Sequence, residues 1–329
     1  MQEAYFASLK AENPNLAIAR VIFSSHDHYR VLLFKTKTEM LAKARGHLLH
    51  NKDELPAIGD LVCVELSTTD HDFVPIESLL PRTSSLKRQD ARGKQEVLVA
   101  NVDFVGLVTS FNQDLNERRL ERGLTMVYES GAKPFVVVNK SDLVTPEIAE
   151  QRISELTSRF PDTPVISCSV RNKQGVEKVS VFFKPGMSVA FLGMSGVGKS
   201  SLINLLIGED RTVTSEIRED DSRGRHTTTH REVFLTNTGY WIIDNPGIRE
   251  FSFAGDDEAL DTTFDDILGF AAKCRFGNCS HTNEPKCGVK DALVSGELSK
   301  DRWENYSKMK REHDYQVKKA SRVKTKGKK

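Results

Sequence analysis

The sequence has no apolar run long enough to cross a bilayer, and its first residues lack the basic segment followed by an apolar one that marks a secretory signal. These absences argue against a membrane partner and against export, so we expect a cytoplasmic protein. An excess of charge of one sign is also missing, because 47 Lys and Arg residues face 46 Asp and Glu residues, for a net charge of +1. Overall charge therefore indicates no class of partner.

Cysteine is scarce, with 5 residues, yet three of them crowd into the stretch CRFGNCSHTNEPKC. In a chain without export signals such a cluster favours metal binding over disulfides. Cys274, Cys279, His281 and Cys287 offer three thiolates and one imidazole, a closed tetrahedral set for one zinc ion that leaves no position open for catalysis. We predict a structural zinc site, and the alternative is a group of ordinary reduced cysteines.

At 329 residues the chain can form two or three domains. Short runs of β-branched and aromatic residues, such as IARVIFSS and YRVLLFKT, predict a small β-barrel of the OB type near the start. Later apolar runs, EVLVANVDFVGLVTS and PFVVVNK, are typical of parallel strands buried on both faces, and amphipathic helices separate them, which indicates an α/β domain.

The composition changes along the chain set the domain limits. The predicted order is an OB-fold-like β-barrel at 1–80, a basic linker at 81–95, the α/β domain at 96–265, a mostly helical zinc-binding domain at 266–315 and a basic disordered tail at 316–329. The tail, QVKKASRVKTKGKK, suits phosphate backbones, although it can equally serve solubility alone.

The stretch GMSGVGKS, residues 193–200, matches the pattern G-x-x-x-x-G-K-[ST] of a phosphate-binding loop, with a strand-like run before it and a helical run after it. Backbone N–H groups of such a loop curl around the β-phosphate of a nucleotide. Lys199 can neutralise the β- and γ-phosphates during catalysis, and Ser200 can bind Mg²⁺ through its hydroxyl. The predicted nucleotide-binding residues of this loop are Gly193, Met194, Ser195, Gly196, Val197, Gly198, Lys199, Ser200 and Ser201.

A second polar stretch, NKSD at residues 139–142, follows the apolar FVVV at the end of a predicted strand. The Asp142 carboxylate can accept hydrogen bonds from the ring N–H and the exocyclic amine of guanine together, a donor pair that adenine lacks. Lys140 can lay its aliphatic stem on the base, and Asn139 can tie this loop to the phosphate loop. This base loop predicts that the nucleotide is GTP or GDP.

Another element follows about 25 residues later, at the end of the strand-like run VISCSV. There Ser167 and Cys168 resemble the last guanine-contacting loop of GTPases, in which a small residue supplies a backbone N–H to the guanine carbonyl oxygen. Cys168 stands where alanine is usual, and a buried strand end of small residues is the alternative.

Two elements after the phosphate loop predict the nucleotide-sensing switches. Asp244 ends the apolar run YWIID, where it can hold Mg²⁺ through water, and the N–H of Gly247 can sense the γ-phosphate. The preceding loop, REDDSRGRHTTTH, is long and charged. A threonine among residues 227–229 can ligate Mg²⁺ when GTP orders this loop, and we favour Thr228.

The residue after Gly247 is Ile248, where Ras-like enzymes have a glutamine that orients the attacking water. An isoleucine side chain cannot hydrogen-bond to water, so intrinsic hydrolysis is expected to be slow or to depend on another group. His226 is the nearest catalytic candidate in the sequence, and an exposed loop histidine is the alternative.

All elements of a GTPase are present, but in the order base loop, base loop, phosphate loop, switch, switch. A parallel α/β domain can be cut in a surface loop and joined at its old termini without loss of its core. The order is therefore that of a circularly permuted GTPase.

The chain resembles the ribosome small-subunit-dependent GTPase A family of bacterial circularly permuted GTPases. The resemblance covers nearly the whole length and rests on FNQDLNERRLERGL, VVVNKSDL, GMSGVGKSSLIN, RGRHTTT, DNPG and CRFGNCSHTNEPKC, in that order. It implies a multidomain protein with an N-terminal OB-fold, a central permuted GTPase domain and a C-terminal zinc domain. It also implies binding to the small ribosomal subunit and its rRNA late in assembly, subunit-stimulated hydrolysis of GTP to GDP and phosphate, and a role for His226 in that hydrolysis. One departure is Asn245, where the family usually has threonine.

Two other classes of function stay open. In the first, an RNA-binding module for rRNA or tRNA uses nucleotide state rather than hydrolysis to control binding. Ile248 is compatible with that reading, whereas the set of Lys199, Ser200 and Asp244 favours turnover. The second is a GTPase that acts on tRNA or on a membrane; the zinc segment and the basic tail argue against the membrane and leave tRNA open. Nothing in the sequence demands a dimer, so we expect a monomer.

Overall fold

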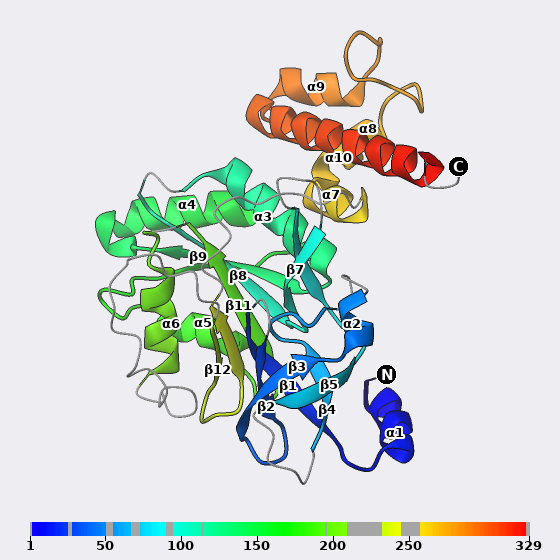
Figure 1. Ribbon diagram of the computed structural model, residues 1–329. Helices are drawn as coiled ribbons and strands as arrows, with labels where there is room; N and C mark the ends of the chain where they lie inside the picture. The colour runs from blue at the N-terminus through cyan, green and yellow to red at the C-terminus, as the bar shows by residue number, and fades with distance from the viewer. Residues whose placement is uncertain are drawn as a thin grey trace. The chain divides into compact units, whose positions relative to one another are not determined.

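The computed structural model describes residues 2–25, 28–50, 55–66, 73–89, 95–112, 115–194, 196–208, 232–244 and 257–326. Contacts divide the chain into two compact units (Figure 1). The first comprises Met1–Lys87, Glu96–Leu115 and Ser130–Glu250, and the second comprises Arg88–Gln95, Asn116–Glu129 and Phe251–Lys329. In the described part of the chain, no helix is long and apolar enough to cross a membrane.

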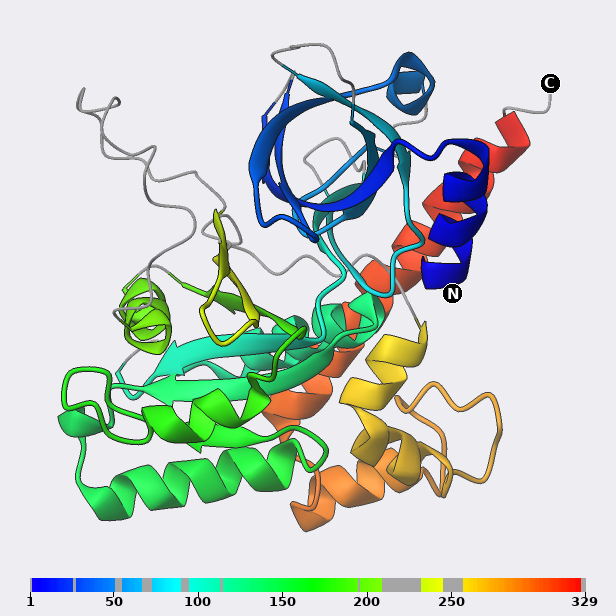
Figure 2. The same cartoon turned by 90° about the horizontal axis from the view of Figure 1, so that it is seen from below.

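The first unit contains a closed five-stranded barrel, whose ring of strands is visible in Figure 2. The strands neighbour one another in the order β1-β2-β3-β5-β4, and β1 closes the ring by pairing with β4. Alternate residues such as Ala19, Val21 and Val31 fill the core, because successive side chains of a strand point to opposite faces. This architecture is an OB-fold, as the sequence predicts. The elements are α1 (Gln2–Glu12), β1 (Leu16–Ser24), β2 (Tyr29–Leu33), β3 (Glu39–Ala44), α2 (Gly46–His50), β4 (Leu61–Glu65) and β5 (Val74–Leu79).

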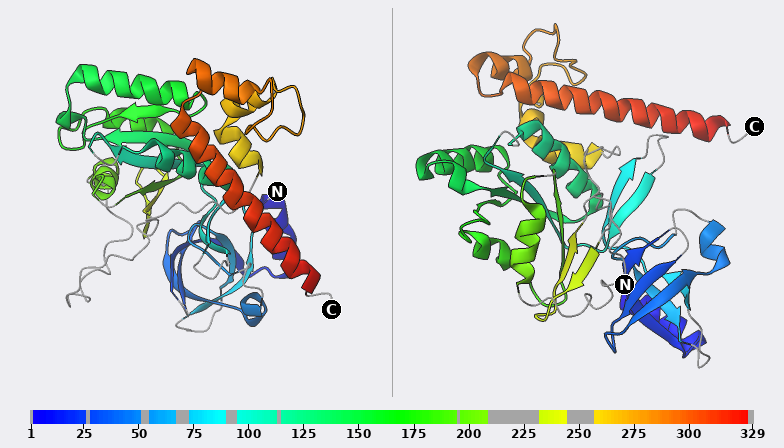
Figure 3. Two further views of the ribbon diagram at one scale, coloured as in Figure 1. Left: turned by 90° about the horizontal axis from the view of Figure 1, so that it is seen from above. Right: turned by 60° about the vertical axis from the view of Figure 1, so that its left-hand side comes forward.

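The predicted α/β domain is confirmed as a six-stranded sheet with the order β10-β9-β8-β11-β13-β12. Five of these strands run parallel, and β12 pairs antiparallel with β13, which follows it after a short turn. Helix α4 packs beside β10, and α6 packs beside β11 and β13 (Figure 3). The elements are β8 (Phe104–Ser110), β9 (Lys133–Asn139), η2 (Ser141–Leu143), α4 (Pro146–Arg159), β10 (Val165–Ser167), α5 (Val176–Val179), η3 (Ser180–Phe182), β11 (Ser188–Gly193), α6 (Lys199–Ile207), β12 (Glu232–Leu235) and β13 (Trp241–Asp244).

Parallel pairing brings the ends of these strands to one edge of the sheet. β9 ends at Asn139, β11 ends at Gly193 and β13 ends at Asp244, so three elements that are far apart in the sequence become neighbours. Open α/β sheets bind ligands outside the carboxyl ends of their strands. The predicted base loop, phosphate loop and magnesium aspartate therefore meet at one edge.

Two further strands join the barrel to the sheet. β6 (Ser85–Gln89) pairs with β7 (Gln95–Ala100), so the stretch predicted as a linker at 81–95 contains a strand. The apolar run EVLVANVDFVGLVTS is divided between β7 and β8. It is interrupted directly after β7 at Asn101, whose φ is +54°. A Cβ added at Gly59 of the barrel would lie 2.2 Å from the Ala100 carbonyl oxygen, so this close approach requires glycine.

The second unit is helical around a core that includes Leu260, Phe264, Val289 and Met309, which confirms the predicted helical character of this region. Its helix α10 continues to Lys326, unlike the disordered tail predicted for 316–329, because lysine, arginine, alanine and glutamine are all good helix formers. The helices are α3 (Glu117–Ser130), α7 (Asp257–Thr263), α8 (Asp265–Ala271), α9 (Gly288–Ser295) and α10 (Lys300–Lys326).

A buried ionic network fixes α3 to α10. Arg302 donates to Oε1 of Glu121 at 2.7 Å, and Asn305 donates to Oε2 of the same carboxylate. Arg302 also donates two hydrogen bonds of 2.7 Å to Asp266. Glu121 and Arg302 are both buried, and a buried pair is tolerated only when its remaining donors and acceptors are satisfied in this way. Most of α3 belongs to the same compact unit as the helices that begin at residue 257. The limits of the α/β domain, 96–265, stay a prediction.

Glu121→Ala should destabilise the second unit by about 3–5 kcal/mol, because it leaves the buried Arg302 charge partly uncompensated. The double variant Glu121→Leu/Arg302→Met should be clearly more stable than the single one, since it removes both charges. Chemical denaturation followed by the fluorescence of Trp303 measures both changes. Arg118→Ala, which breaks an exposed ion pair with Asp301, should cost less than about 1 kcal/mol. Equal losses in the single and double variants would contradict the assignment.

Candidate nucleotide and zinc sites

The phosphate loop connects β11 to α6, as its motif requires. Gly196 and Gly198 have φ values of +87° and +92°, a region that favours glycine. A Cβ added at Gly198 would lie 2.3 Å from Nδ2 of Asn139, and one at Gly193 would lie 2.5 Å from the Val108 carbonyl oxygen. The glycines of the motif therefore allow both the curvature of the loop and its close approach to β8 and β9. Ser200 and Ser201 lie in the first turn of α6.

Asn139 ties the base loop to the phosphate loop. Its side chain is buried, its Nδ2 donates to the Val197 carbonyl at 2.9 Å, and its Oδ1 accepts from the N–H of Val170 at 3.1 Å. Lys140, in a left-handed conformation with φ of +62°, donates from Nζ to the Gly196 carbonyl at 2.6 Å. The two loops thus form one hydrogen-bonded structure even though the sequence separates them widely.

The carboxylate of Asp142 is held by a residue that the sequence analysis did not select. The hydroxyl of Ser169, which is fully buried, donates to Oδ1 of Asp142 at 2.6 Å. The predicted pair lies two residues earlier: Ser167 ends β10, and the Cys168 N–H donates to the Val138 carbonyl at 3.0 Å. Cys168 also contacts the base loop, because its carbonyl accepts from the N–H of Ser141 at 3.1 Å. Ser169 and Val170 therefore lie beside the base loop together with Cys168, and the role of Ser167 and Cys168 in guanine binding stays a prediction.

The side chain of Cys168 supports Asn139 instead. Its Sγ lies 3.7 Å from Oδ1 of Asn139, and burial raises the pKa of the Cys168 thiol to about 12. A thiol with such a pKa stays protonated and unreactive near neutral pH. The second serine of VISCSV is the sequence feature that could have indicated the contact of Ser169 with Asp142.

Lys199 and Asp244 form a close ion pair at the centre of the sheet edge, and only 8% of the lysine side chain is exposed. The ammonium group at the start of α6 is thereby held next to the last residue of β13. The predicted lysine for the phosphates and the predicted aspartate for Mg²⁺ are direct neighbours.

Other predicted residues lie outside the part of the chain that the structure describes. They are Ser195 of the phosphate loop, the catalytic candidate His226, the magnesium candidate Thr228 with its alternatives Thr227 and Thr229, and Asn245, Gly247 and Ile248. Their roles stay predictions.

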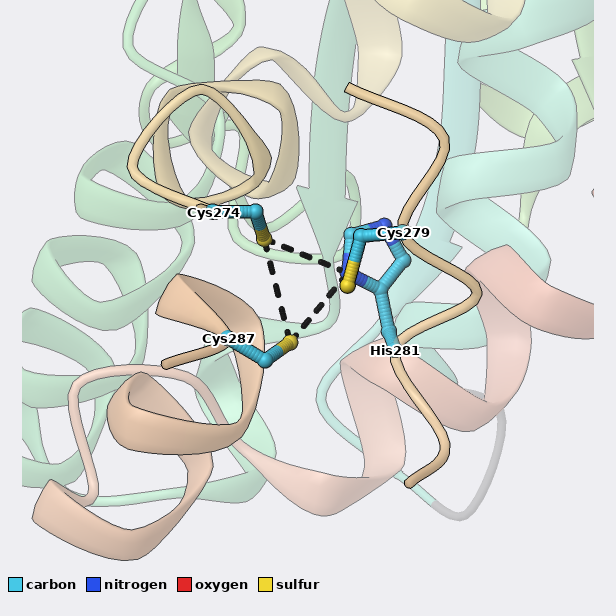
Figure 4. Close-up of side chains that lie close together, drawn as sticks. All are labelled: Cys274, Cys279, His281 and Cys287. Carbon is cyan, nitrogen blue, oxygen red and sulfur yellow. Dashed lines mark hydrogen bonds between the residues drawn. The ribbon is translucent and has the colours of Figure 1, made fainter. Parts of the chain in front are cut away.

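The four predicted zinc ligands lie together in the second unit (Figure 4). Cys274 follows α8, Cys287 caps the start of α9, and Cys279 and His281 come from the loop between them. All four ligand atoms lie within 4.8 Å of one another. The ring of Trp303 meets the His281 ring edge to face at 5.6 Å, which fixes the imidazole from the side of α10.

The separations among the ligand atoms of Cys274, His281 and Cys287 fit three corners of a tetrahedron around one zinc ion. Neighbouring ligand atoms should be about 3.5–3.8 Å apart when Zn–S is about 2.3 Å and Zn–N about 2.0–2.1 Å. The observed separations are 3.8 Å between the sulfurs of Cys274 and Cys287, 3.5 Å from Cys274 to Nδ1 of His281, and 3.3 Å from that nitrogen to Cys287. Desolvation and hydrogen bonding to the neighbouring thiols raise the pKa of Cys279 to about 11.

The sheet, the joined loops at its edge and their order along the chain define a P-loop GTPase domain in circularly permuted order. A family model described as RsgA GTPase matches residues 79–254. The chain belongs to the RsgA GTPase family, and it is a GTPase.

Individual relatives match over most of their length. The chain is 39% identical over 315 residues to the small ribosomal subunit biogenesis GTPase RsgA 2 of Lactiplantibacillus plantarum, with 94% of this chain and 87% of the relative covered. It is also 41% identical over 268 residues to the RsgA of Methanosarcina acetivorans, with 80% and 72% covered.

Solved structures show the same architecture. YjeQ from Thermotoga maritima aligns with a TM-score of 0.67 at 26% identity, covering 91% of this chain and 98% of its own. YloQ, described as a circularly permuted GTPase, aligns with a TM-score of 0.63 at 25% identity, covering 91% and 95%.

Proposed function

We propose that this GTPase acts in the biogenesis of the small ribosomal subunit and hydrolyses GTP to GDP and phosphate faster when it is bound to the subunit. The observation that carries the proposal is the match of nearly the whole chain to relatives named for that process. The cytoplasm is the proposed compartment, and a monomer is the proposed form.

The joined loops support a specific division of labour. Asp142 reads the guanine edge, Ser169 keeps its carboxylate in place, and the N–H of Val170 keeps the Asn139 amide in place. Lys199 stabilises the β- and γ-phosphates, and Ser200 supplies a hydroxyl to Mg²⁺.

The remaining roles are proposals from the sequence. Thr228 completes the magnesium shell, Asp244 holds Mg²⁺ through water, and the N–H of Gly247 senses the γ-phosphate. His226 serves hydrolysis, since Ile248 cannot orient water. The second metal is one structural zinc held by the four ligands of the second unit.

An aromatic and basic cluster on the barrel supports rRNA as a partner. The rings of Phe23 and His28 lie 6.0 Å apart, and those of His28 and Phe73 lie 6.3 Å apart. Arg30 lies 4.8 Å over Phe23, and Lys43 lies 4.1 Å over Phe73. Unpaired bases stack on aromatic side chains of OB-folds while cations meet their phosphates.

The test is GTP hydrolysis with and without purified small ribosomal subunits, with large subunits and ATP as controls. Small subunits alone should raise the GTPase rate at least about tenfold, equivalent to roughly 1.4 kcal/mol of the barrier. His226→Ala should lose most of that stimulation while keeping GTP affinity.

A rate that no ribosomal particle changes would contradict the proposal. It would favour the alternative of an RNA-binding switch, for which nucleotide state controls RNA affinity. That alternative predicts that the affinity for RNA differs between the protein bound to GDP and the protein bound to a non-hydrolysable GTP analogue. It also predicts that RNA binding does not depend on GTP hydrolysis.

A further inference from the structure

Arg20 is a buried arginine outside the nucleotide site. It lies in β1 between Ala19 and Val21, which face the barrel core, so its own side chain leaves the outer surface of the barrel. Only 5% of the residue is exposed, and its Nε and Nη1 have no hydrogen-bond partner among the described residues. Burial lowers the pKa of Arg20 to about 10, although Asp103 and Asp60 act in the opposite direction. A buried cation with open donors destabilises a fold, so packing alone does not account for this arginine.

The group that Arg20 contacts is the indole of Trp241 in the central sheet. The guanidinium lies 4.6 Å from the ring centroid, within the range of a cation–π interaction. The ring of Phe34, which follows β2 of the barrel, lies 6.0 Å from the same indole. Trp241 is itself only 3% exposed. The barrel therefore contacts this one residue of the sheet with both a cation and an aromatic ring.

Trp241 is the first residue of β13, and Asp244 is the last. This strand is held between β11 and β12, with Trp241 in register with Ser188 and Asp244 in register with Phe191. At about 3.3 Å per residue the two ends are about 10 Å apart. Because the strand is buried and hydrogen-bonded on both sides, a shift at its start is transmitted to its end.

The acidic residues near Arg20 do not explain its place. Asp60 already accepts hydrogen bonds from Arg82 at 2.8 and 2.6 Å and from the Ala57 N–H at 2.7 Å. Asp103 accepts from the N–H and the hydroxyl of Ser188, at 2.8 and 3.0 Å. Both carboxylates attract the guanidinium through their charge, but their hydrogen bonds go elsewhere, and the direct contact of Arg20 is with Trp241.

We propose that Arg20 is a positioning residue for Asp244. Through Trp241 and β13, it sets the place of this carboxylate relative to Lys199, and thus the affinity of the site for Mg²⁺ with GTP. The inference rests on the proposed role of Asp244 in holding Mg²⁺. Linkage requires the reverse effect as well. Binding of Mg²⁺ and GTP changes the strength of the contact between the barrel and Trp241, and hence the affinity of the barrel for its own ligand.

The test compares Arg20→Met with the unchanged full-length chain. Methionine keeps the volume and removes the cation. GDP affinity without Mg²⁺ should stay within about twofold, whereas the Mg²⁺ concentration that half-saturates binding of a non-hydrolysable GTP analogue should rise about fivefold or more. Arg20→Lys, which keeps the charge but loses the planar group, should give an intermediate shift. Arg45→Met is the matched control, because Arg45 lies on the same barrel with ion pairs to Glu65 and Glu77 and should change neither quantity.

A second variant separates this inference from the function on which it rests. If Asp244→Ala leaves the Mg²⁺ dependence unchanged, the proposed role of Asp244 is wrong and the inference falls with it. If Asp244→Ala shifts that dependence and Arg20→Met does not, the inference alone is overturned. An equal loss of affinity with and without Mg²⁺ in Arg20→Met would also overturn it, since that pattern reports damage to the fold. If Arg20→Met fails to fold, Trp241→Phe is tested instead, because it removes the indole that Arg20 contacts. It should raise the half-saturating Mg²⁺ concentration by the same factor.

Discussion

Asp142→Asn should lower the affinity for GTP and GDP by about 100-fold or more and make xanthosine triphosphate the preferred nucleotide. In its proposed role the carboxylate accepts two hydrogen bonds from guanine, and hydrogen bonds to a charged group contribute about 1.5–3 kcal/mol each. Asparagine replaces one of these acceptors by a donor, which matches the C2 carbonyl oxygen of xanthine instead of the amine of guanine.

The contact with Ser169 strengthens this expectation. Its hydroxyl donates to Oδ1 of Asp142 at 2.6 Å, and in the variant the same hydroxyl would select the amide orientation in which oxygen faces Ser169. The amide nitrogen is then the group left for the C2 carbonyl of xanthine. Ser169→Ala alone should weaken GTP binding by only about 1 kcal/mol, because it loosens the carboxylate without removing it.

Competition between fluorescent GTP and unlabelled nucleotides measures the change in preference. Hydrolysis of xanthosine triphosphate by Asp142→Asn at close to the original GTP rate would show that the phosphate loop is intact. Asp162→Asn, at an exposed carboxylate in the turn before β10, is the control and should leave GTP affinity unchanged. If Asp142→Asn still prefers GTP, the stretch NKSD does not read the base.

The accuracy of the sequence-based predictions depends on how local each feature is. The phosphate loop is set by its own glycines and by the strand and helix beside it, so its position was predictable, and so was the tie from Asn139 to it. The contact of Ser169 with Asp142 was not predicted. Strand ends are uncertain by one or two residues, and VISCSV offers a serine on both sides of Cys168. Only the pairing of β10 with β9 shows that Ser167 still belongs to the strand.

Contacts between distant residues that belong to no recognised motif were not predictable. The helical spacing of NERRLERGL gives no sign that Glu121 is buried, because its partner Arg302 comes 181 residues later. The contact of Arg20 with Trp241 is of the same kind, since an arginine in a strand of a small barrel is expected to be exposed. A single sequence contains both partners of each pair but no pattern that relates them.

Removal of the metal should unfold the zinc segment and much of the second unit. No helix or strand lies between Cys274 and Cys287, and Phe276 in this loop is 41% exposed, so few apolar contacts hold the segment. Structural zinc contributes about 10–16 kcal/mol of apparent binding free energy at pH 7 in small domains. That is comparable with the whole stability of a typical domain, about 5–15 kcal/mol.

Cys287→Ser should therefore abolish binding of the proposed zinc ion and remove most of the ordered packing between α8 and α9. Elemental analysis measures the metal, and circular dichroism with Trp303 fluorescence measures the fold, because Trp303 lies against His281. Cys63→Ser, at a buried position of β4 in the first unit, should keep one zinc ion per chain. Loss of zinc from both variants would contradict the assignment of the ligands.

The same site should lose zinc as the pH falls. Zinc binds the thiolates, so the metal-free unit holds more protons than the zinc-bound unit, and lowering the pH favours the metal-free form. The raised pKa of Cys279, about 11, means that zinc must displace its proton throughout the neutral range. A chelator titration at pH 6 and pH 8 should show weaker zinc binding at pH 6, with unfolding that follows zinc loss at both values. A second unit that stays folded after complete zinc removal would show instead that the core around Phe264 and Val289 suffices to hold α8 and α9 together.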